Sequence, residues 1–381
     1  MNSEERREAR RKRREEKRRL KREQRASACT LSDVADLNAL YKAQRRAARG
    51  VSWKSSTQRY QAHWLLNINR SHNALMAGDE ICRGFNEFVL CERGKLRHIS
   101  SVHFDERVVH KSLTQNALIP SIAPGLIRNN TANIEGRGTS DAIRRVKAAM
   151  ARHYRRHGAE GYVLQIDFRS YFSSIPHEGV FALIDKAMRD EELKALAKHL
   201  VEVQGEVGLG LGSEPNQIYA VAFPDRLDHF VTECCGVEAY VRYMDDLVVI
   251  HHDKAELQCV LAVMRDMCGR LGLATNDKKT RIAKLSRGFT FLKKKFGYSE
   301  TGRVVVRQCR DSITRQRRKL KRQARLVEAG EMTLAQMEQS YQSWRSSLKG
   351  LDAHGTGSSM DALYASLVER LARQGDPPPQ P

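Results

Sequence analysis

The chain has 381 residues, 41% of them hydrophobic and 29% charged, a composition that excludes a largely disordered protein and predicts a sizeable core. Lysine and arginine number 66 against 45 acidic residues, so the formal net charge of +21 predicts a nucleic-acid partner, with a basic structural protein as the alternative. No apolar run approaches the ~20 residues of a membrane span, so we expect a cytoplasmic protein with reduced cysteines and no membrane partner.

The first 26 residues hold thirteen Lys/Arg and six Glu, with Leu20 as the only large apolar side chain past Met1. This pattern predicts a solvated helix or a disordered arm, because nothing in it can bury a face. We assign residues 1–50 to a basic N-terminal extension, which either solubilises the chain or contacts a phosphate backbone. From about Leu37 the pattern becomes globular and helical.

The middle of the chain mixes strand-like and helix-like patterns. Three runs are typical of strands, namely GYVLQIDF, AYVRYMDDLVVIHH and GFTFLKKKF. Helical periodicity covers 139–156, 179–204 and 255–272, and helices return after Gly302 over 333–349 and 359–373. The pattern predicts an α+β fold that ends in a loose Pro-rich tail.

Acidic residues stand where two of the predicted strands end. Asp245 and Asp246 interrupt an apolar run, which predicts a hairpin whose turn presents both carboxylates, and Asp167 ends another strand. Helix capping and solvated turns explain most pairs of adjacent aspartates. Crowded carboxylates otherwise favour a divalent cation, and two ions of Mg²⁺ or Mn²⁺ ~3.5–4 Å apart suit phosphoryl transfer.

Several segments together resemble the reverse transcriptases. YMDD at 243–246 and DFRSYF at 167–172 are similar to the two palm motifs of that family, in the right order and about 75 residues apart. Further similar segments are RGKLRHISSVHFDERVVHKSL (93–113), ANIEGRGTSDAI (132–143), GLGLGSEPNQ (208–217), LGLATNDKKT (271–280) and GFTFLKKKF (288–296). The resemblance implies an RNA-directed DNA polymerase that extends a DNA or RNA primer on an RNA template with dNTPs.

The resemblance also implies a right-hand polymerase fold with fingers, a palm built on an antiparallel sheet, and a helical thumb. We expect fingers and palm over 51–300, the thumb over 301–372 and a disordered tail over 373–381. No segment resembles a nuclease centre, so any nuclease activity is expected to come from another protein.

The family's metal ligands match Asp167 and Asp245, with Asp246 as a weaker or indirect ligand and the backbone carbonyl of Phe168 facing a metal. Lys279 matches the lysine that protonates the pyrophosphate leaving group, and the neighbouring Lys278 is its rival.

Nucleotide-binding positions of the family match Arg97 and Arg137 for the triphosphate and Phe172 for the steric gate against a 2′-hydroxyl. Leu211 and Gln217 match positions around the incoming nucleotide. The primer grip matches Phe291 and Leu292. The basic thumb face, expected to lie against the template–primer backbone, comprises Arg315, Arg317, Arg318, Lys319, Lys321 and Arg322. A solvated helix is the alternative for this face.

Leu211 stands where many reverse transcriptases carry a glutamine, and Gly212 with Asn216 and Gln217 is closer to the form found in diversity-generating retroelements. We hypothesise relaxed base selection, because an apolar side chain removes one hydrogen-bonding check. The resemblance leaves open an antiviral defence system of the abortive-infection type, a diversity-generating retroelement, and a maturase-like RNA-binding protein. A dedicated noncoding RNA or an accessory subunit would be a partner in the first two cases.

Overall fold

A computed structural model describes residues 3–92, 94–237 and 239–375 of the chain. Its contacts group into two units, each discontinuous in sequence. Unit 1 comprises Met1–Ala142, Ile166–Leu247 and Cys259–Thr280, and unit 2 comprises Ile143–Gln165, Val248–Gln258 and Arg281–Pro381. The segments of the expected fingers, palm and thumb remain predictions, and most of the expected loose tail lies outside the described residues.

The N-terminal part of unit 1 is mostly helical, with one hairpin. Its helices are α1 (Ser3–Ala26), α2 (Leu31–Ala35), α3 (Leu37–Ala47), α4 (Ser55–Ala62), α5 (Trp64–Ala77), α6 (Phe104–Leu113), the π-helical η1 (Thr114–Leu118), α7 (Ile119–Ile122) and the short 3₁₀ turn η2 (Ala123–Gly125). The hairpin pairs β1 (Phe85–Glu92) with β2 (Lys95–Val102). Leu40 and Ala43 of α3 share a core cluster with Tyr60 and Ile68, so folded structure begins well before residue 50.

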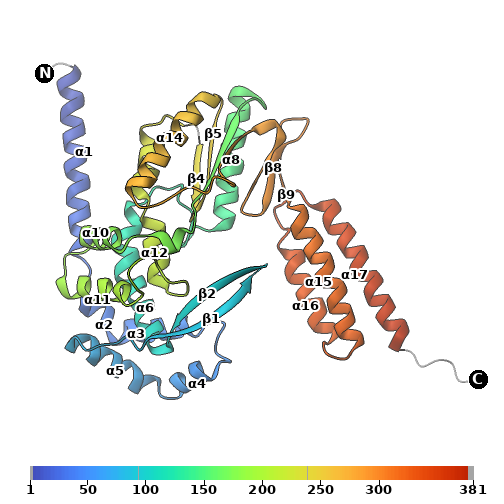
Figure 1. Cartoon of the computed structure of the whole chain (residues 1–381), viewed down its shortest axis with the longest axis horizontal. Coiled ribbons are helices and arrows are strands. Elements are labelled where there is room, and N and C mark those ends of the chain that lie inside the picture. Colours follow the sequence, from blue (N-terminus) through green and yellow to red (C-terminus); the bar gives the residue numbers. More distant parts are fainter. Residues whose placement is uncertain (1–2, 93, 238, 376–381) are drawn as a thin grey trace, which may run out of the picture. The chain divides into compact units, whose positions relative to one another are not determined.

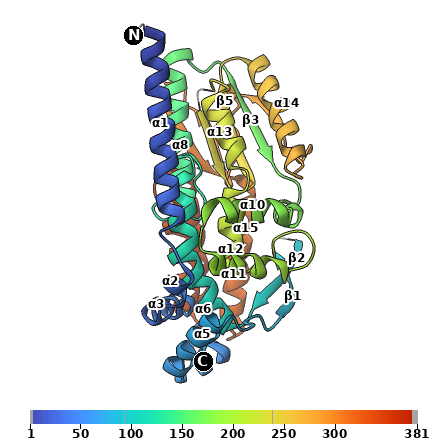
Figure 2. The ribbon, with the colours of Figure 1, turned by 90° about the vertical axis from the view of Figure 1, so that its left-hand side faces the viewer.

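Helices and the aspartate-bearing hairpin make up the rest of unit 1. They are α9 (Tyr171–Ser174), α10 (His177–Ala187), α11 (Glu191–Glu202), α12 (Glu214–Ala222), α13 (Asp225–Glu233), β4 (Ala239–Tyr243) and the beginning of β5 (Asp246–His251). Helices α10 and α12 lie side by side, as do α10 and α11 (Figure 2). Helix α14 (Lys254–Arg270) begins in unit 2 and ends in unit 1.

The central sheet has the strand order β4-β5-β3-β6, where β3 is Tyr162–Asp167 and β6 is Arg281–Lys284. The interior residues of β3 and nearly all of β5 are buried, and within the interior of β3 all but Gln165 are apolar. Strand β3 pairs antiparallel with β6, Tyr162 opposite Lys284. Within this sheet, β3 ends at Asp167 and β5 begins at Asp246.

Unit 2 contains a small sheet and a helical bundle. It holds most of α8 (Thr139–His157), the 3₁₀ turn η3 (Leu285–Arg287), the antiparallel strands β7 (Phe289–Phe291), β8 (Lys294–Tyr298) and β9 (Val304–Gln308), and the helices α15 (Arg310–Glu328), α16 (Leu334–Ser346) and α17 (His354–Gly375). The last three helices form a bundle (Figure 1). Tyr341 is 2% exposed and stacks on Tyr364 at 4.5 Å, so the aromatic residues of α16 build this core.

The predicted α+β class is confirmed, and one predicted helix is wrong. Residues 179–204 form two helices, α10 and α11, because Met188 is extended and Asp190 caps α11 by accepting a hydrogen bond from the Leu193 N–H at 2.7 Å. Residues Ser3–Ala26 form a helix rather than a disordered arm. Among the described helices, none has the length and apolar character needed to cross a membrane.

Candidate active site

The turn between β4 and β5 carries the two adjacent aspartates. Strand β4 ends at Tyr243 and β5 begins at Asp246, so the chain reverses over Met244 and Asp245. Met244 has φ 56°, a left-handed conformation that costs a residue with a side chain about 1–2 kcal/mol. The predicted hairpin is confirmed, and its turn presents Asp245 next to the first residue of β5.

Asp167, 78 positions earlier, lies beside this turn. The backbone N–H of Phe168 donates to the carbonyl of Asp245 at 3.2 Å, and the N–H of Asn276 donates to the carbonyl of Asp167 at 2.8 Å. These bonds join the end of β3, the hairpin turn and the loop after α14 within unit 1. The structure thus brings together the three segments that the motifs identified.

The Asp167 carboxylate is held by two side chains from the loop after α14. Lys279 Nζ lies 2.6 Å from Oδ2, and the amide of Asn276 donates to Oδ1 at 3.2 Å. Lys279 is half exposed while Asp167 is 14% exposed. Of the two candidate lysines, Lys279 is the one that reaches the acidic cluster, since its ammonium contacts the carboxylate directly.

Negative charge accumulates around Asp245. Burial raises the pKa of Asp245 and the nearby Asp167 raises it further, whereas Lys279 and Arg97 act in the opposite direction. Arg97, on β2, therefore contributes positive charge at this site, and its contact with a triphosphate remains a prediction. Carboxylates crowded in a partly buried place favour a bound divalent cation.

The ligand atoms of the three aspartates are more widely spaced than those of a closed metal site. Among the described residues, the only three ligand atoms that lie within 4.8 Å of one another belong to Glu80, Cys82 and His199. The salt bridge to Lys279 occupies Oδ2 of the Asp167 carboxylate. Asp246 is half-buried at the start of β5.

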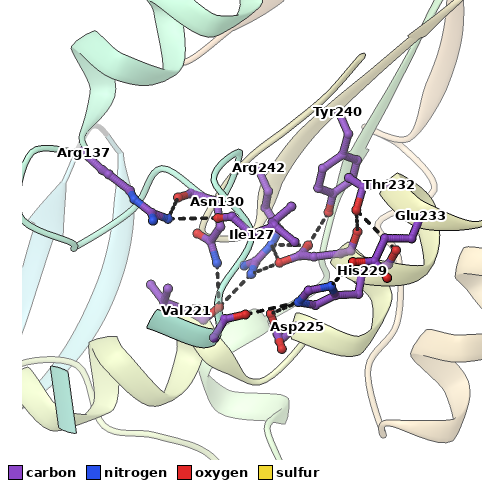
Figure 3. A network of polar contacts seen from close by, with 12 residues as sticks. Ile127, Asn130, Arg137, Val221, Asp225, His229, Thr232, Glu233, Tyr240 and Arg242 are labelled. Carbon is purple, nitrogen blue, oxygen red and sulfur yellow. Dashed lines mark hydrogen bonds and ion pairs between the residues drawn. The ribbon is translucent and has the colours of Figure 1, made fainter. Parts of the chain in front are cut away.

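A buried ion pair stabilises the β4–β5 hairpin (Figure 3). Arg242 of β4 donates three hydrogen bonds to Asp228 of α13, at 2.6, 2.8 and 3.0 Å, and both side chains are fully buried. Tyr240 donates to the same carboxylate. Arg242 also donates to the carbonyl of Met244 at 3.0 Å, so its guanidinium fixes the turn that carries Asp245.

The same arginine holds the loop that precedes α8. The N–H of Thr131 donates to the Arg242 carbonyl at 2.9 Å, and the amide of Asn130 donates to the carbonyl of Val221 at 3.0 Å. Arg137 donates to the carbonyls of Ile127 and Asn130 at 2.9 and 2.8 Å (Figure 3). Arg137 thus stabilises this loop, and its contact with a triphosphate remains a prediction.

A glycine-containing loop lies next to Phe172 and Ser100. The N–H of Leu209 donates to the Phe172 carbonyl at 2.7 Å. A Cβ on Gly212, whose φ is 125°, would meet the Ser100 carbonyl at 3.2 Å, so this position favours glycine. Asn216, 1% exposed, donates to the Gly210 carbonyl at 2.9 Å, which ties the loop to α12.

Three of the residues predicted to bind the nucleotide, Phe172, Leu211 and Gln217, are each half-buried. Phe172 stands on α9 with its ring at 5.9 Å and 81° from that of the fully packed Tyr171. Leu211 lies in the glycine-containing loop, and Gln217 on α12 accepts a hydrogen bond from Asn133 at 2.9 Å. Phe172 therefore lies beside the loop that contains Leu211. The contacts of both residues with a nucleotide are predictions.

The remaining predicted residues lie in unit 2. Phe291 is fully buried in the β7–β8 hairpin, and Leu292 adopts φ 47° at its turn, so the Phe291 ring belongs to the core and only Leu292 can offer its side chain to a primer. The six basic residues predicted on the thumb are all exposed on α15, whose buried positions are Gln316, Leu320, Gln323 and Ala324.

Sequence reasoning missed the supporting residues of the site. Arg242 and Asp228 belong to no family motif, although a lone arginine within the apolar strand AYVRY was a signal. Such a residue must pair with a buried acid, and only the fold identifies Asp228 as that acid.

Comparison with known proteins agrees with this geometry. The profile of the family described as "Reverse transcriptase (RNA-dependent DNA polymerase)" matches residues 86–296, more than half of the chain. The chain belongs to the reverse transcriptase family. The match includes Asp167, Asp245 and Asp246, and membership brings the predicted right-hand polymerase fold with it. No curated protein matches this reverse transcriptase.

Many solved structures match, among them telomerases. Apo telomerase from Candida tropicalis truncated from its C-terminal domain is 12% identical, with 59% of this chain and 54% of that chain covered and a TM-score of 0.44. Telomerase from Candida albicans with a fragment of telomeric RNA is 9% identical, with 64% and 50% covered and a TM-score of 0.46. The chain spans about half the length of these telomerases.

Proposed function

We propose that this reverse transcriptase is an active RNA-directed DNA polymerase that extends a primer by two-metal phosphoryl transfer of dNTPs. The observation that carries the proposal is the meeting of Asp167 with Asp245, joined by the hydrogen bond from Phe168 N–H to the Asp245 carbonyl at 3.2 Å. A protein that only binds nucleic acid gains nothing from crowded carboxylates in a basic chain, because they repel the phosphate backbone. This argues against a maturase-like role without polymerase activity.

The donor set fits two Mg²⁺ ions, with Mn²⁺ as a substitute. Asp167, Asp245 and the Phe168 carbonyl offer hard oxygen ligands, and Asp246 would act as the weaker or indirect ligand. When bound, the ions would activate the primer 3′-hydroxyl and neutralise the departing pyrophosphate. Lys279, already at the Asp167 carboxylate, is the residue we assign to protonating the leaving group.

RNA template, primer and dNTPs are the proposed partners. The net charge of +21 and the exposed basic face of α15 support a sequence-independent, salt-sensitive contact with the template–primer backbone. Phe172 supports a preference for deoxynucleotides, since its ring would occupy the space of a 2′-hydroxyl.

For the biological setting we propose antiviral defence in a bacterium or phage, with the protein in the cytoplasm. A diversity-generating retroelement is the second candidate, favoured by Gly210-Leu211-Gly212 in place of Pro-Gln-Gly and by the spacing of Gly212 to Asn216 and Gln217. Neighbouring genes distinguish the two, since a template repeat indicates diversification and a structured noncoding RNA or a second polymerase indicates defence.

Incorporation of labelled nucleotides on a primed RNA template tests the activity. The purified chain should extend the primer with dNTPs in Mg²⁺ or Mn²⁺, and Asp245→Asn should abolish extension. Asp266→Asn, a change of an exposed aspartate on α14, is the matched control and should extend normally. Failure to extend any RNA- or DNA-templated primer in either metal would overturn the proposal.

A further inference from the structure

A second cluster of metal-type ligands lies away from the aspartates. Glu80 and Cys82 belong to the loop between α5 and β1, and His199 stands on α11, all within unit 1. One ligand atom from each residue lies within 4.8 Å of the other two. Carboxylate, thiolate and imidazole from two separate elements therefore converge on one point.

The three side chains are already oriented by hydrogen bonds. His199 Nε2 lies 2.8 Å from Glu80 Oε2, and the Cys82 N–H donates to Glu80 Oε1 at 2.6 Å. Ligand atoms around a tetrahedral ion at about 2.0–2.3 Å are separated by roughly 3.3–3.7 Å. Small side-chain rotations would thus admit an ion without a change in the backbone.

The charge around the sulfur favours a cation. Cys82 is half-buried, and the carboxylates of both Glu80 and Glu106 act on its thiol. Glu106 is 3% exposed and accepts a hydrogen bond from the Arg83 N–H at 2.6 Å, so its carboxylate is held beside the loop. Without an ion, the Glu80 carboxylate is shared by His199 and by the thiol of Cys82, and a bound ion would take the place of these contacts.

We propose that Glu80, Cys82 and His199 bind one Zn²⁺ ion, which clips the loop before β1 to α11. Thiolate and imidazole together select zinc over the hard ions of the polymerase site. The fourth position would be filled by water, because Glu80 and His199 are 57% and 38% exposed. Binding would stabilise the base of the β1–β2 hairpin, since the ion joins two elements that are otherwise linked by side-chain hydrogen bonds.

Metal content of the purified full chain tests the proposal. After dialysis against Mg²⁺ buffer, elemental analysis should find about one zinc per chain. Cobalt added to chelator-treated protein should give thiolate-to-cobalt charge-transfer absorption, which ions bound only by the aspartates cannot produce. Cys82→Ser and His199→Ala should lose the zinc and the absorption.

Matched controls are Cys91→Ser and His98→Ala on the β1–β2 hairpin, which should keep both signals. Zinc should also raise the unfolding temperature of the chelator-treated wild type and leave that of Cys82→Ser unchanged. Absence of zinc together with no cobalt–thiolate band would overturn the proposal, as would equal zinc retention in Cys82→Ser. None of these readouts depends on polymerase activity, so the zinc site and the proposed activity can fail separately.

Discussion

Arg242 Nη2 lies 2.6 Å from Asp228 Oδ2, and neither side chain is exposed to solvent. Burial alone would lower the pKa of Arg242, but the charge and hydrogen bonds of Asp228 outweigh it and raise that pKa above its ordinary value. Arg242 therefore stays charged inside the protein, where it also donates to the carbonyl of Met244 in the turn that carries Asp245.

We expect Asp228→Asn to destabilise the protein by about 3–5 kcal/mol, because it leaves the guanidinium buried without its counter-charge. The double variant Arg242→Met/Asp228→Leu should be less destabilised than the sum of its single variants. Urea unfolding measures both. Arg265→Met, which breaks the exposed pair with Asp277, should cost at most about 1 kcal/mol. Equal losses at the buried and exposed pairs would contradict the role of the buried pair.

Lys279→Ala should lower the rate of nucleotide addition by about 10²-fold, since the proton donor to the leaving group is lost. Lys278→Ala is the matched control and should have a much smaller effect, because Lys279 is the lysine that contacts Asp167. Single-turnover primer extension over a range of pH measures the step. Comparable losses from the two substitutions would show that the contact has no catalytic meaning.

Phe172→Ala should reduce discrimination against ribonucleotides by roughly 10–100-fold, because the space beside the sugar is opened. Competition between dNTP and NTP in primer extension measures the ratio. Phe181→Ala, a change of another half-buried aromatic residue, should leave the ratio unchanged. An unaltered preference in Phe172→Ala would remove this residue from the gate.

Leu211→Gln should lower the misincorporation rate, since the amide restores a hydrogen-bonding check at the nucleotide. Val207→Gln places the same side chain at an exposed position of the same segment and should not change the error rate. Sequencing of reverse-transcribed products measures the rate. Equal error rates in the parent and Leu211→Gln would reject relaxed selection through this residue.

Acid should destabilise the protein through His110. Burial lowers the pKa of His110 to about 4 in the folded chain. In the unfolded chain His110 is protonated below about pH 6.5, whereas in the folded chain it stays neutral down to about pH 4. This contribution to stability is complete above pH 6.5 and is lost as pH falls toward 4, by about 2 kcal/mol at pH 5. His110→Gln should lose less stability than wild type between pH 7.5 and pH 5 in urea unfolding, and an identical loss would exclude His110 as the source.

The acidic site was predictable from the sequence because its residues end or interrupt apolar strands. Asp167 and Asp245 follow runs that form strands, and the family motifs fix their order. The break between α10 and α11 was not predictable from periodicity, since the apolar spacing continues across Met188 while Asp190 begins a new helix. The partners of Arg242 and Lys279 required the fold, because they lie 14 and 112 positions away.

The C-terminal end of helix α1 contacts Arg189, which follows α10. Arg189 donates to both Glu23 carboxylate oxygens, at 2.7 and 2.9 Å, and its N–H donates to the Ala26 carbonyl at 3.1 Å. An exposed ion pair of this kind contributes little to stability and weakens further in concentrated salt. Raised ionic strength would therefore weaken the Arg189–Glu23 attachment of α1, while the core behind Leu31 and Val34 stays intact.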